Sequence, residues 1–220
     1  MALIARESGG GGTFTPVPPG MYLARCYRIV DLGTQKSEYL GQIKNLSKVM
    51  LQFEVHGEDD AGKPLVTAKG EPMSISKNFT LSLAEKATLR KDLQTWRGKE
   101  FTADELRGFQ IDNVLGAWAM IAITKAMGNN GKEYTNIANI NSVPKPMKAN
   151  LPEGHNKCAA FYIESPDMDM FETFSDNLRA KIEQSPEWQA RKGERYAKEQ
   201  NASANSKGSG FDDMDDDIPF

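Results

Sequence analysis

The chain has 220 residues, of which 39% are hydrophobic and 26% are charged, which is enough for one hydrophobic core of ordinary size and too little for two large ones. No apolar run approaches the roughly 18 residues of a membrane-spanning helix, and the apolar stretch at the N-terminus is too short for a signal peptide. The two cysteines, Cys26 and Cys158, lie far apart without CxxC spacing, so we expect a cytoplasmic protein that does not associate with membranes.

Charge is distributed unevenly along the chain. The formal net charge is -3 for the whole protein, but residues 1–150 hold 19 basic and 15 acidic residues. The last ten residues hold five aspartates and no basic residue. The body of the protein is therefore mildly basic, which is compatible with a polyanionic partner.

The first half of the chain predicts three strands after a flexible arm. Residues 1–20 contain many glycines and prolines without a periodic pattern, which is typical of such an arm. Segment 21–33 is rich in aromatic and branched residues, and segments 48–57 and 73–83 alternate between apolar and polar side chains. The apolar residues that share one face are Val49, Leu51, Phe53 and Val55 in the second strand, and Met73, Ile75, Phe79 and Leu81 in the third.

A helix should follow the third strand. Ser82 and Glu85 have the spacing of a capping box, and Gly98 lies where a C-terminal cap belongs, so the helix should span roughly residues 83–97. Its apolar stripe consists of Leu89, Leu93 and Trp96. This stripe indicates that one face of the helix packs on the strands.

The next segments complete the pattern of a small barrel. Thr102 and Glu105 repeat the capping signature for a short helical turn, and residues 116–143 predict two strands around the turn GNNG. Three strands, a helix and two strands follow each other in an OB-fold, a partly open five-stranded Greek-key barrel that binds oligonucleotides. Other small barrels share this order. We predict a mainly β protein with an OB-fold domain over residues 21–148.

Residues 149–199 are predicted to form a helical extension. Ser165 and Ser185 each precede a proline at the first position of a helix, which predicts helices over roughly 166–183 and 186–199. The apolar stripe of the first helix consists of Phe171, Phe174, Leu178 and Ile182. Two alternatives exist for this stripe: it packs on the barrel, or it meets a neighbouring subunit in a homo-oligomer.

Sequence patterns for catalysis and metal binding are missing. The two histidines, His56 and His155, have no partner at metal-ligand spacing, and no P-loop, GxSxG or HExxH motif occurs. Residues 56–60, HGEDD, offer carboxylates to a metal, but they lie among turn residues between two strands, so we favour a solvated hairpin tip. We therefore expect no catalytic residue, no metal and no cofactor.

The predicted barrel offers groups that suit a single nucleic-acid strand. Such binding uses cations along the phosphates and flat side chains on which bases stack, each stacked base contributing about 1 to 3 kcal/mol. The candidates are Arg25, Tyr27, Arg28, Lys36, Tyr39, Lys44, Lys48, Lys77, Phe79, Trp118, Lys125, Lys132 and Tyr134. We place Lys36, Tyr39 and Lys44 in a long loop after the first strand.

Each aromatic candidate has packing as an alternative. Phe79 shares the parity of the apolar residues in its strand, so we favour the core for it. Trp118 has the parity opposite to the apolar residues of its strand, which leaves an exposed platform and a second core as equal alternatives. Tyr39 and Tyr134 lie next to loop lysines, so they are the favoured stacking residues.

The last ten residues, FDDMDDDIPF, follow a predicted linker over residues 200–210. Dense like charge keeps such a segment solvated and disordered, and a basic partner attracts it. Phe220 brings a ring and a free carboxylate together, so an apolar pocket flanked by Arg or Lys would capture both. The residues expected to bind protein partners are Asp212, Asp213, Asp215, Asp216, Asp217, Ile218, Pro219 and Phe220.

Two resemblances extend these expectations. DDDIPF after a small-residue linker resembles the acidic tip of bacterial single-stranded DNA-binding proteins, which recruits replication, repair and recombination proteins. The segments ARCYRIVDLGTQ, WRGKEFTADELRGF, YTNIANINSVPKP and ESPDMDMFETFSDNLRAKIEQSPEW are similar to a family of small OB-fold proteins of tailed phages and prophages, regarded as single-stranded DNA-binding or replication proteins. The predicted helices after residue 165 have no counterpart in the bacterial protein, so its tetramer does not carry over.

Sequence and resemblance together predict a non-enzymatic single-stranded DNA-binding protein in the cytoplasm of a bacterial host. It would coat exposed strands during phage DNA replication or recombination and recruit partner proteins through its acidic tip. One alternative is an adaptor whose barrel binds a protein instead of DNA. Another is an enzyme with an unrecognised carboxylate site.

Overall fold

The computed structural model describes residues 15–39, 41–128, 131 and 133–193. Most of the predicted arm, Lys132, the linker and the acidic tip lie outside the described residues. The protein is mainly β, as predicted. Two compact units divide the chain, residues 1–30 with 48–160 and residues 31–47 with 161–220. In the part of the chain that is described, no helix is long and apolar enough to cross a membrane.

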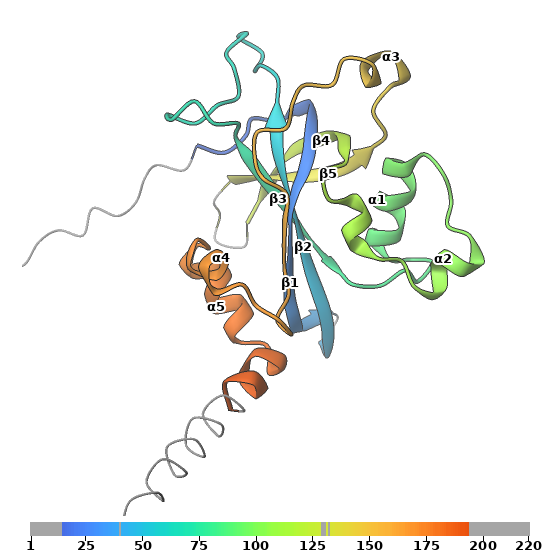
Figure 1. Ribbon diagram of the computed structural model, residues 1–220, viewed down its shortest axis with the longest axis vertical. Coiled ribbons are helices and arrows are strands. Elements are labelled where there is room, and N and C mark those ends of the chain that lie inside the picture. The colour runs from blue at the N-terminus through green and yellow to red at the C-terminus, as the bar shows by residue number, and fades with distance from the viewer. Residues whose placement is uncertain (1–14, 40, 129–130, 132, 194–220) are drawn as a thin grey trace, which may run out of the picture. The chain divides into compact units, whose positions relative to one another are not determined.

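Five strands form one antiparallel sheet in the order β3-β2-β1-β4-β5, and a short β6 pairs with β1 (Figure 1). The strands are β1 (Gly20–Tyr39), β2 (Gln42–His56), β3 (Ser74–Thr80), β4 (Trp118–Met127), β5 (Glu133–Asn141) and β6 (Ala159–Phe161). Among the described residues, no strand pairing joins β3 to β5, so the sheet is not closed. The long loop expected after the first strand is wrong, because β1 and β2 continue as a hairpin almost to their turn.

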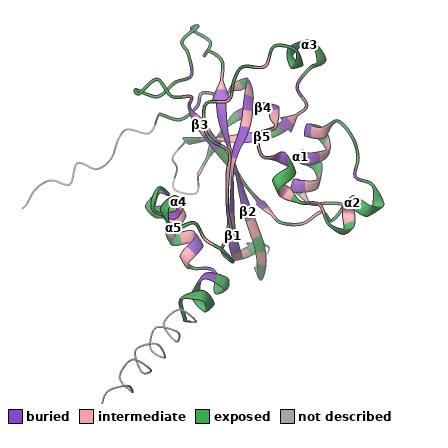
Figure 2. Cartoon of the chain, in the orientation of Figure 1, coloured by how far each residue is buried: buried purple, intermediate pink, exposed green. Residues whose placement is uncertain are grey.

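The core of the first unit follows the predicted alternation. Val49, Leu51, Phe53 and Val55 are all buried on one face of β2. The helix α1 (Thr88–Arg97) adds Leu89, Leu93 and Trp96, and the ring of Trp96 lies 5.5 Å from that of Phe53. Figure 2 shows the strands buried along the middle of the sheet and the helices exposed on their outer sides. Met50 and Glu54, on the other face of β2, are buried too, although the alternation predicts exposed side chains on that face.

Turn chemistry shifts the start of α1. The helix begins at Thr88 instead of near residue 83, because the Ser82 hydroxyl accepts a hydrogen bond from the Ala84 N–H (3.2 Å) and does not form the predicted capping box. The strand β3 has already ended at Thr80, and Leu81 is exposed instead of sharing the core face. Gly98 ends the helix in the left-handed conformation at φ 67°, as predicted.

The predicted capping box at Thr102 is confirmed. It begins α2 (Ala103–Arg107): the Thr102 hydroxyl accepts from the Glu105 N–H, and the Glu105 carboxylate accepts from the Thr102 N–H. Figure 1 shows α1 and α2 together on one side of the sheet. A 3-10 turn, η1 (Ile111–Val114), then leads into β4, and a short α3 (Lys145–Lys148) follows β5.

The second unit has an aromatic core of its own. It contains α4 (Met168–Glu172), α5 (Asp176–Glu183) and a further helical stretch over residues 186–193. The buried aromatic residues are Phe161, Phe171, Phe174 and Trp188. The rings of Phe171 and Trp188 stack with centroids 4.6 Å apart. The predicted apolar stripe therefore packs within its own unit.

The helix limits of the second unit differ in part from the prediction. The single helix expected over 166–183 is interrupted, because Ser175 caps a new helix, α5, by accepting from the Leu178 N–H. Asp167, and not Ser165, caps α4. The prediction for Ser185 is confirmed, since its hydroxyl accepts from the Trp188 N–H at 3.3 Å.

Candidate nucleic-acid interface

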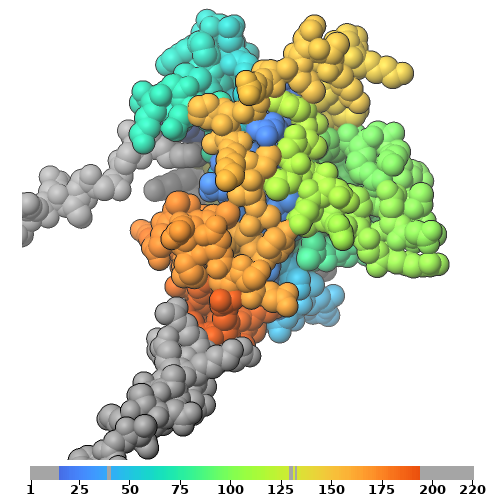
Figure 3. All heavy atoms as spheres, viewed as in Figure 1, coloured from blue at the N-terminus to red at the C-terminus, as the bar shows by residue number. Residues whose placement is uncertain are grey.

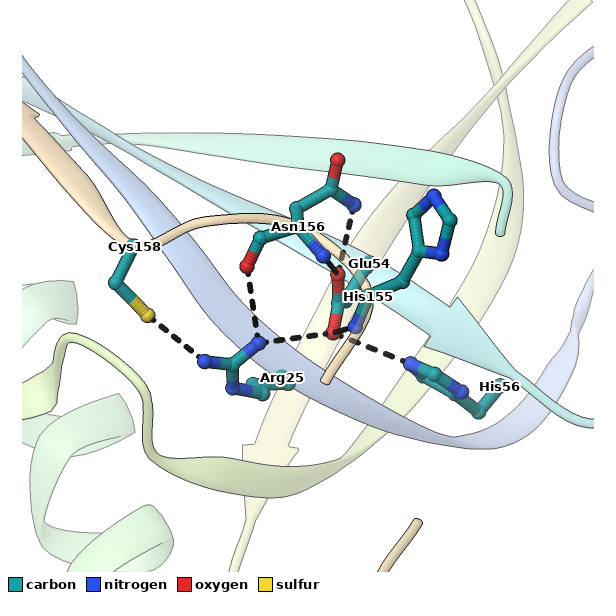
Figure 4. Close-up of polar contacts among 6 residues, drawn as sticks. All are labelled: Arg25, Glu54, His56, His155, Asn156 and Cys158. Atoms are coloured by element: carbon teal, nitrogen blue, oxygen red, sulfur yellow. Dashed lines mark hydrogen bonds and ion pairs between the residues drawn. The ribbon is translucent and has the colours of Figure 1, made fainter. Parts of the chain in front are cut away.

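A buried carboxylate organises the outer face of β1 and β2. The side chain of Glu54 is fully buried, and its Oε1 lies 3.2 Å from Nη1 of Arg25 and 3.3 Å from Nε2 of His56. Figure 4 shows both side chains converging on Glu54. A carboxylate is stable in such a place only when paired and hydrogen-bonded, so these contacts fix the position of Arg25 and His56.

The chain just before β6 completes this network. The backbone N–H groups of His155 and Asn156 donate to the Glu54 carboxylate at 3.0 and 2.7 Å, and the Asn156 side-chain amide donates at 2.7 Å. Arg25 donates to the Asn156 carbonyl at 3.1 Å and to Sγ of Cys158 at 3.0 Å. The His155 ring points away from the network (Figure 4), and the segment lies over β1 (Figure 3). Glu54 and Arg25 therefore hold this segment against the sheet.

The pKa of Glu54 results from opposing effects. Burial raises it, but the hydrogen bonds from Asn156, His56 and Arg25 together lower it by more than burial raises it. The pKa of Glu54 therefore lies below its ordinary value. Glu54 is consequently a fixed negative charge at neutral pH, balanced by Arg25. The nearby Cys26 differs, because burial raises the pKa of its thiol to about 12 and keeps it neutral.

His56 lies against an aromatic ring at the start of β4. The centroids of His56 and Trp118 are 4.9 Å apart, and the rings are tilted by 60°. Trp118 pairs with Arg25 in the register of β1 and β4, and its carbonyl accepts a hydrogen bond from Nε1 of Trp96 at 2.8 Å. Both rings are partly exposed. Trp118 therefore lies at the rim of the polar network. Its partial exposure is intermediate between the two predicted alternatives, an exposed platform and a second core.

Two candidate cations are held in ion pairs. Nζ of Lys77 lies 2.7 Å from Oδ2 of Asp92 on α1 and donates to the Ala138 carbonyl on β5 at 3.2 Å. Lys77 shares the parity of the core residues of β3, so it joins α1 and β5 to β3 instead of lying on the outer face. Arg25 is committed to Glu54 in the same way. The positive charges of Lys77 and Arg25 are therefore each balanced by a carboxylate of the protein.

Two candidate rings are buried. Phe79 belongs to the hydrophobic core, as favoured from its parity. Tyr27 is also buried, with the guanidinium of Arg28 5.4 Å from its ring centroid, and burial raises the pKa of its hydroxyl. Neither ring presents an open face to a base. Lys48 is partly exposed, and its Nζ donates to the Thr80 hydroxyl at 2.8 Å.

The hairpin of β4 and β5 brings two candidates to the surface. Tyr134 is 49% exposed and pairs across the strands with the small residue Ala126. Lys125 is the next residue in register and forms an exposed ion pair with Glu133 at 3.3 Å. Successive strand residues point to opposite faces, so the exposed Tyr134 ring and the solvated Lys125 lie on opposite faces of this hairpin.

The distal part of the β1 and β2 hairpin belongs to the second unit. Lys36 and Lys44 are exposed there, and Ile43, the second residue of β2, is 68% exposed. Tyr39 is the last residue of β1, and only its backbone is described. These three candidates remain predictions.

Sequence reasoning did not select Glu54 or Asn156, and it weighed His56 only as a metal ligand. Alternation placed Glu54 on the polar face of its strand, where exposure is expected. Its burial depends on the segment at Asn156, and no local pattern links residues so far apart. Among the described residues, no group of three or more His, Cys, Asp or Glu side chains is arranged to hold a metal ion.

No family model and no curated protein matches the chain. The assignment of a function therefore depends on the geometry of these sites and on the sequence resemblances given above.

Proposed function

We propose that the protein binds single-stranded DNA and recruits partner proteins through its acidic tip. The observation that carries this proposal is the exposed ring of Tyr134 on the β4 and β5 hairpin. An exposed ring stacks a base, and cations elsewhere on the protein, such as Lys125 on the other face of the hairpin, neutralise the phosphates. Stacking tolerates any base, so binding of this kind does not depend on sequence.

The strand order supports an OB-type fold. The order β3-β2-β1-β4-β5, with α1 between β3 and β4, is expected of that barrel apart from the unpaired join of β3 and β5. The hydrogen bond from Lys77 on β3 to the Ala138 carbonyl on β5 spans this join. A partly open barrel of this kind suits the proposed ligand.

The partners are proposed from the tip. Its sequence resembles the acidic tip of bacterial single-stranded DNA-binding proteins, and we propose the same recruiting role, in phage DNA replication or recombination within a bacterial cytoplasm. The terminal Phe220 would supply the ring and carboxylate that a basic, apolar pocket captures.

Binding of labelled oligo(dT) across a salt series tests the DNA proposal. If about four phosphates are neutralised, log K should fall against log salt with a slope of roughly -3. Tyr134→Ala should weaken binding by about 1 to 3 kcal/mol. Leu81→Ala, which shortens an exposed apolar side chain on the same unit, should leave it unchanged. A flat salt response, or binding to a single sequence only, would contradict the proposal.

An adaptor that binds protein is the second candidate. It is favoured by the strong exposure of Ile43 and Met127, apolar residues on the two hairpins. In this case the tip would still bind partners, but oligo(dT) would not bind at any salt concentration.

A further inference from the structure

Two partly exposed rings of the first unit, His56 and Trp118, lie outside the proposed stacking site at Tyr134. His56 ends β2 and Trp118 begins β4, the two strands that flank β1, and their ring centroids are 4.9 Å apart. We infer that they form a second base-stacking site for single-stranded nucleic acid. This inference rests on the proposed DNA binding and adds a second contact to it.

Both rings are held in position before any ligand binds. Nε2 of His56 is 3.3 Å from Oε1 of Glu54, and Glu54 is itself fixed by Arg25 and Asn156. The backbone of Trp118 is anchored by the hydrogen bond from Trp96 at 2.8 Å. Rings that are fixed in advance lose little conformational entropy on binding, which favours affinity.

Each of the two rings also keeps part of its surface exposed. Their planes are tilted by 60°, and tilted rings cover less of each other's faces than parallel ones. The His56 side chain retains 18% of its exposure, and Trp118 is partly exposed as well. The site is therefore open at the surface.

The charges around the site select a base over a phosphate. The Glu54 carboxylate, which contacts His56, is balanced by the Arg25 guanidinium at 3.2 Å. No surplus positive charge remains in this pair to attract a phosphate, and the carboxylate repels one. A flat, uncharged nucleobase suits the two rings, while cations elsewhere, such as Lys125, neutralise the backbone.

Tryptophan fluorescence of the unaltered, full-length protein tests the inference directly. The chain has three tryptophans, and Trp96 and Trp188 are only 6% and 4% exposed. A base that stacks at His56 and Trp118 should therefore report through Trp118. Addition of oligo(dT) should quench the emission and shift it in step with the anisotropy of the labelled oligonucleotide.

Variants provide the second measurement. Trp118→Ala and His56→Ala should each weaken oligo(dT) binding by about 5-fold to 150-fold, the range of one stacked base. Trp118→Phe and His56→Phe keep a flat ring and should restore most of the affinity. Tyr162→Ala removes an exposed ring of the other unit and should change nothing.

The outcomes separate this inference from the proposed function. If oligo(dT) binds and Tyr134→Ala weakens it, but the emission of the unaltered protein does not change and folded His56→Ala binds normally, the second site is overturned and DNA binding stands. If the unaltered protein does not bind oligo(dT), both are overturned. A quench that disappears in Trp118→Phe, with affinity retained, supports the site.

Discussion

Gly154 lies directly against the guanidinium of Arg25, so a Cβ at this position would overlap Nη1. Arg25 cannot move aside without breaking its bonds to Glu54, Asn156 and Cys158. We predict that Gly154→Ala lowers the free energy of unfolding by about 1 to 3 kcal/mol. Urea unfolding followed by circular dichroism measures this loss.

Gly108 provides the matched control for this prediction. Nothing lies within 4 Å of a Cβ built on Gly108, and its φ of -174° is ordinary extended backbone. Gly108→Ala should therefore change the stability by no more than about 0.5 kcal/mol. Equal losses in the two variants would show that Arg25 is not the cause.

Glu54 should make the free energy of unfolding depend on pH in the acidic range. Its pKa in the folded state lies below the ordinary value, although burial opposes this shift, because Asn156, His56 and Arg25 donate to it. The unfolded chain then binds the proton more readily, with a pKa of about 4.3. The stabilisation is complete above that pH and is lost as the pH falls through the lower, folded-state pKa.

Comparison with Glu54→Gln isolates this contribution. Other carboxyls add slopes of their own, such as Glu105, whose pKa is lowered chiefly by the hydrogen bond from the Thr102 N–H. The stability gap between the unaltered protein and Glu54→Gln should be widest near neutral pH and should narrow below about pH 4. Urea unfolding between pH 3 and 7 gives the gap, and a gap independent of pH would contradict the prediction.

Lys77 should matter for stability and not for DNA. Lys77→Met leaves the buried Asp92 without its cation, so the free energy of unfolding should fall by about 1 to 3 kcal/mol. The affinity for oligo(dT) should stay within about twofold of the unaltered value, in contrast to Tyr134→Ala. A fall in the affinity for oligo(dT) without a loss of stability would instead mean that Lys77 contacts the nucleic acid.

The two thiols should differ in reactivity. Cys26 is buried, and burial raises its pKa to about 12, whereas Cys158 is partly exposed. Reaction with a thiol reagent at about pH 8 should therefore label Cys158 alone in the native protein and both cysteines in urea, since the thiolate is the reactive form. Cys158→Ser should abolish the native reaction. Labelling of Cys26 and Cys158 at equal rates without denaturant would contradict the burial of Cys26 in the structure.

Much of the first unit could be predicted from short patterns. Alternation in β2 identified its buried face at Val49 and Phe53, and the helical stripe that ends at Trp96 identified the buried face of α1. Gly98 and Thr102 marked helix ends correctly, because their turn chemistry involves only neighbours in sequence. The order of strands and helix followed from these elements.

The errors share a physical cause, which is contact between distant parts of the chain. Glu54 is buried by a segment about a hundred residues later, and Lys77 forms an ion pair with Asp92 on α1. Parity along a strand cannot reveal either partner. The candidate site was predicted best at Tyr134, where exposure follows from the hairpin alone.

The second unit unites residues 31–47 with residues from 161 onward, which leave the ribosome at different times. At the usual rate of synthesis, 5 to 20 residues per second, the ribosome makes the hairpin residues 31–47 roughly 6 to 20 s before it reaches the helical residues of the same unit. Gly33 and the side chains of Ser185 and Ile163 come into close contact only then. Until that moment Leu32, which is buried in the finished protein, lies on a hairpin whose own unit is still incomplete. Newly made chains thus pass through a stage in which the first unit has all of its residues and the second does not, and this is the stage at which chaperones would act.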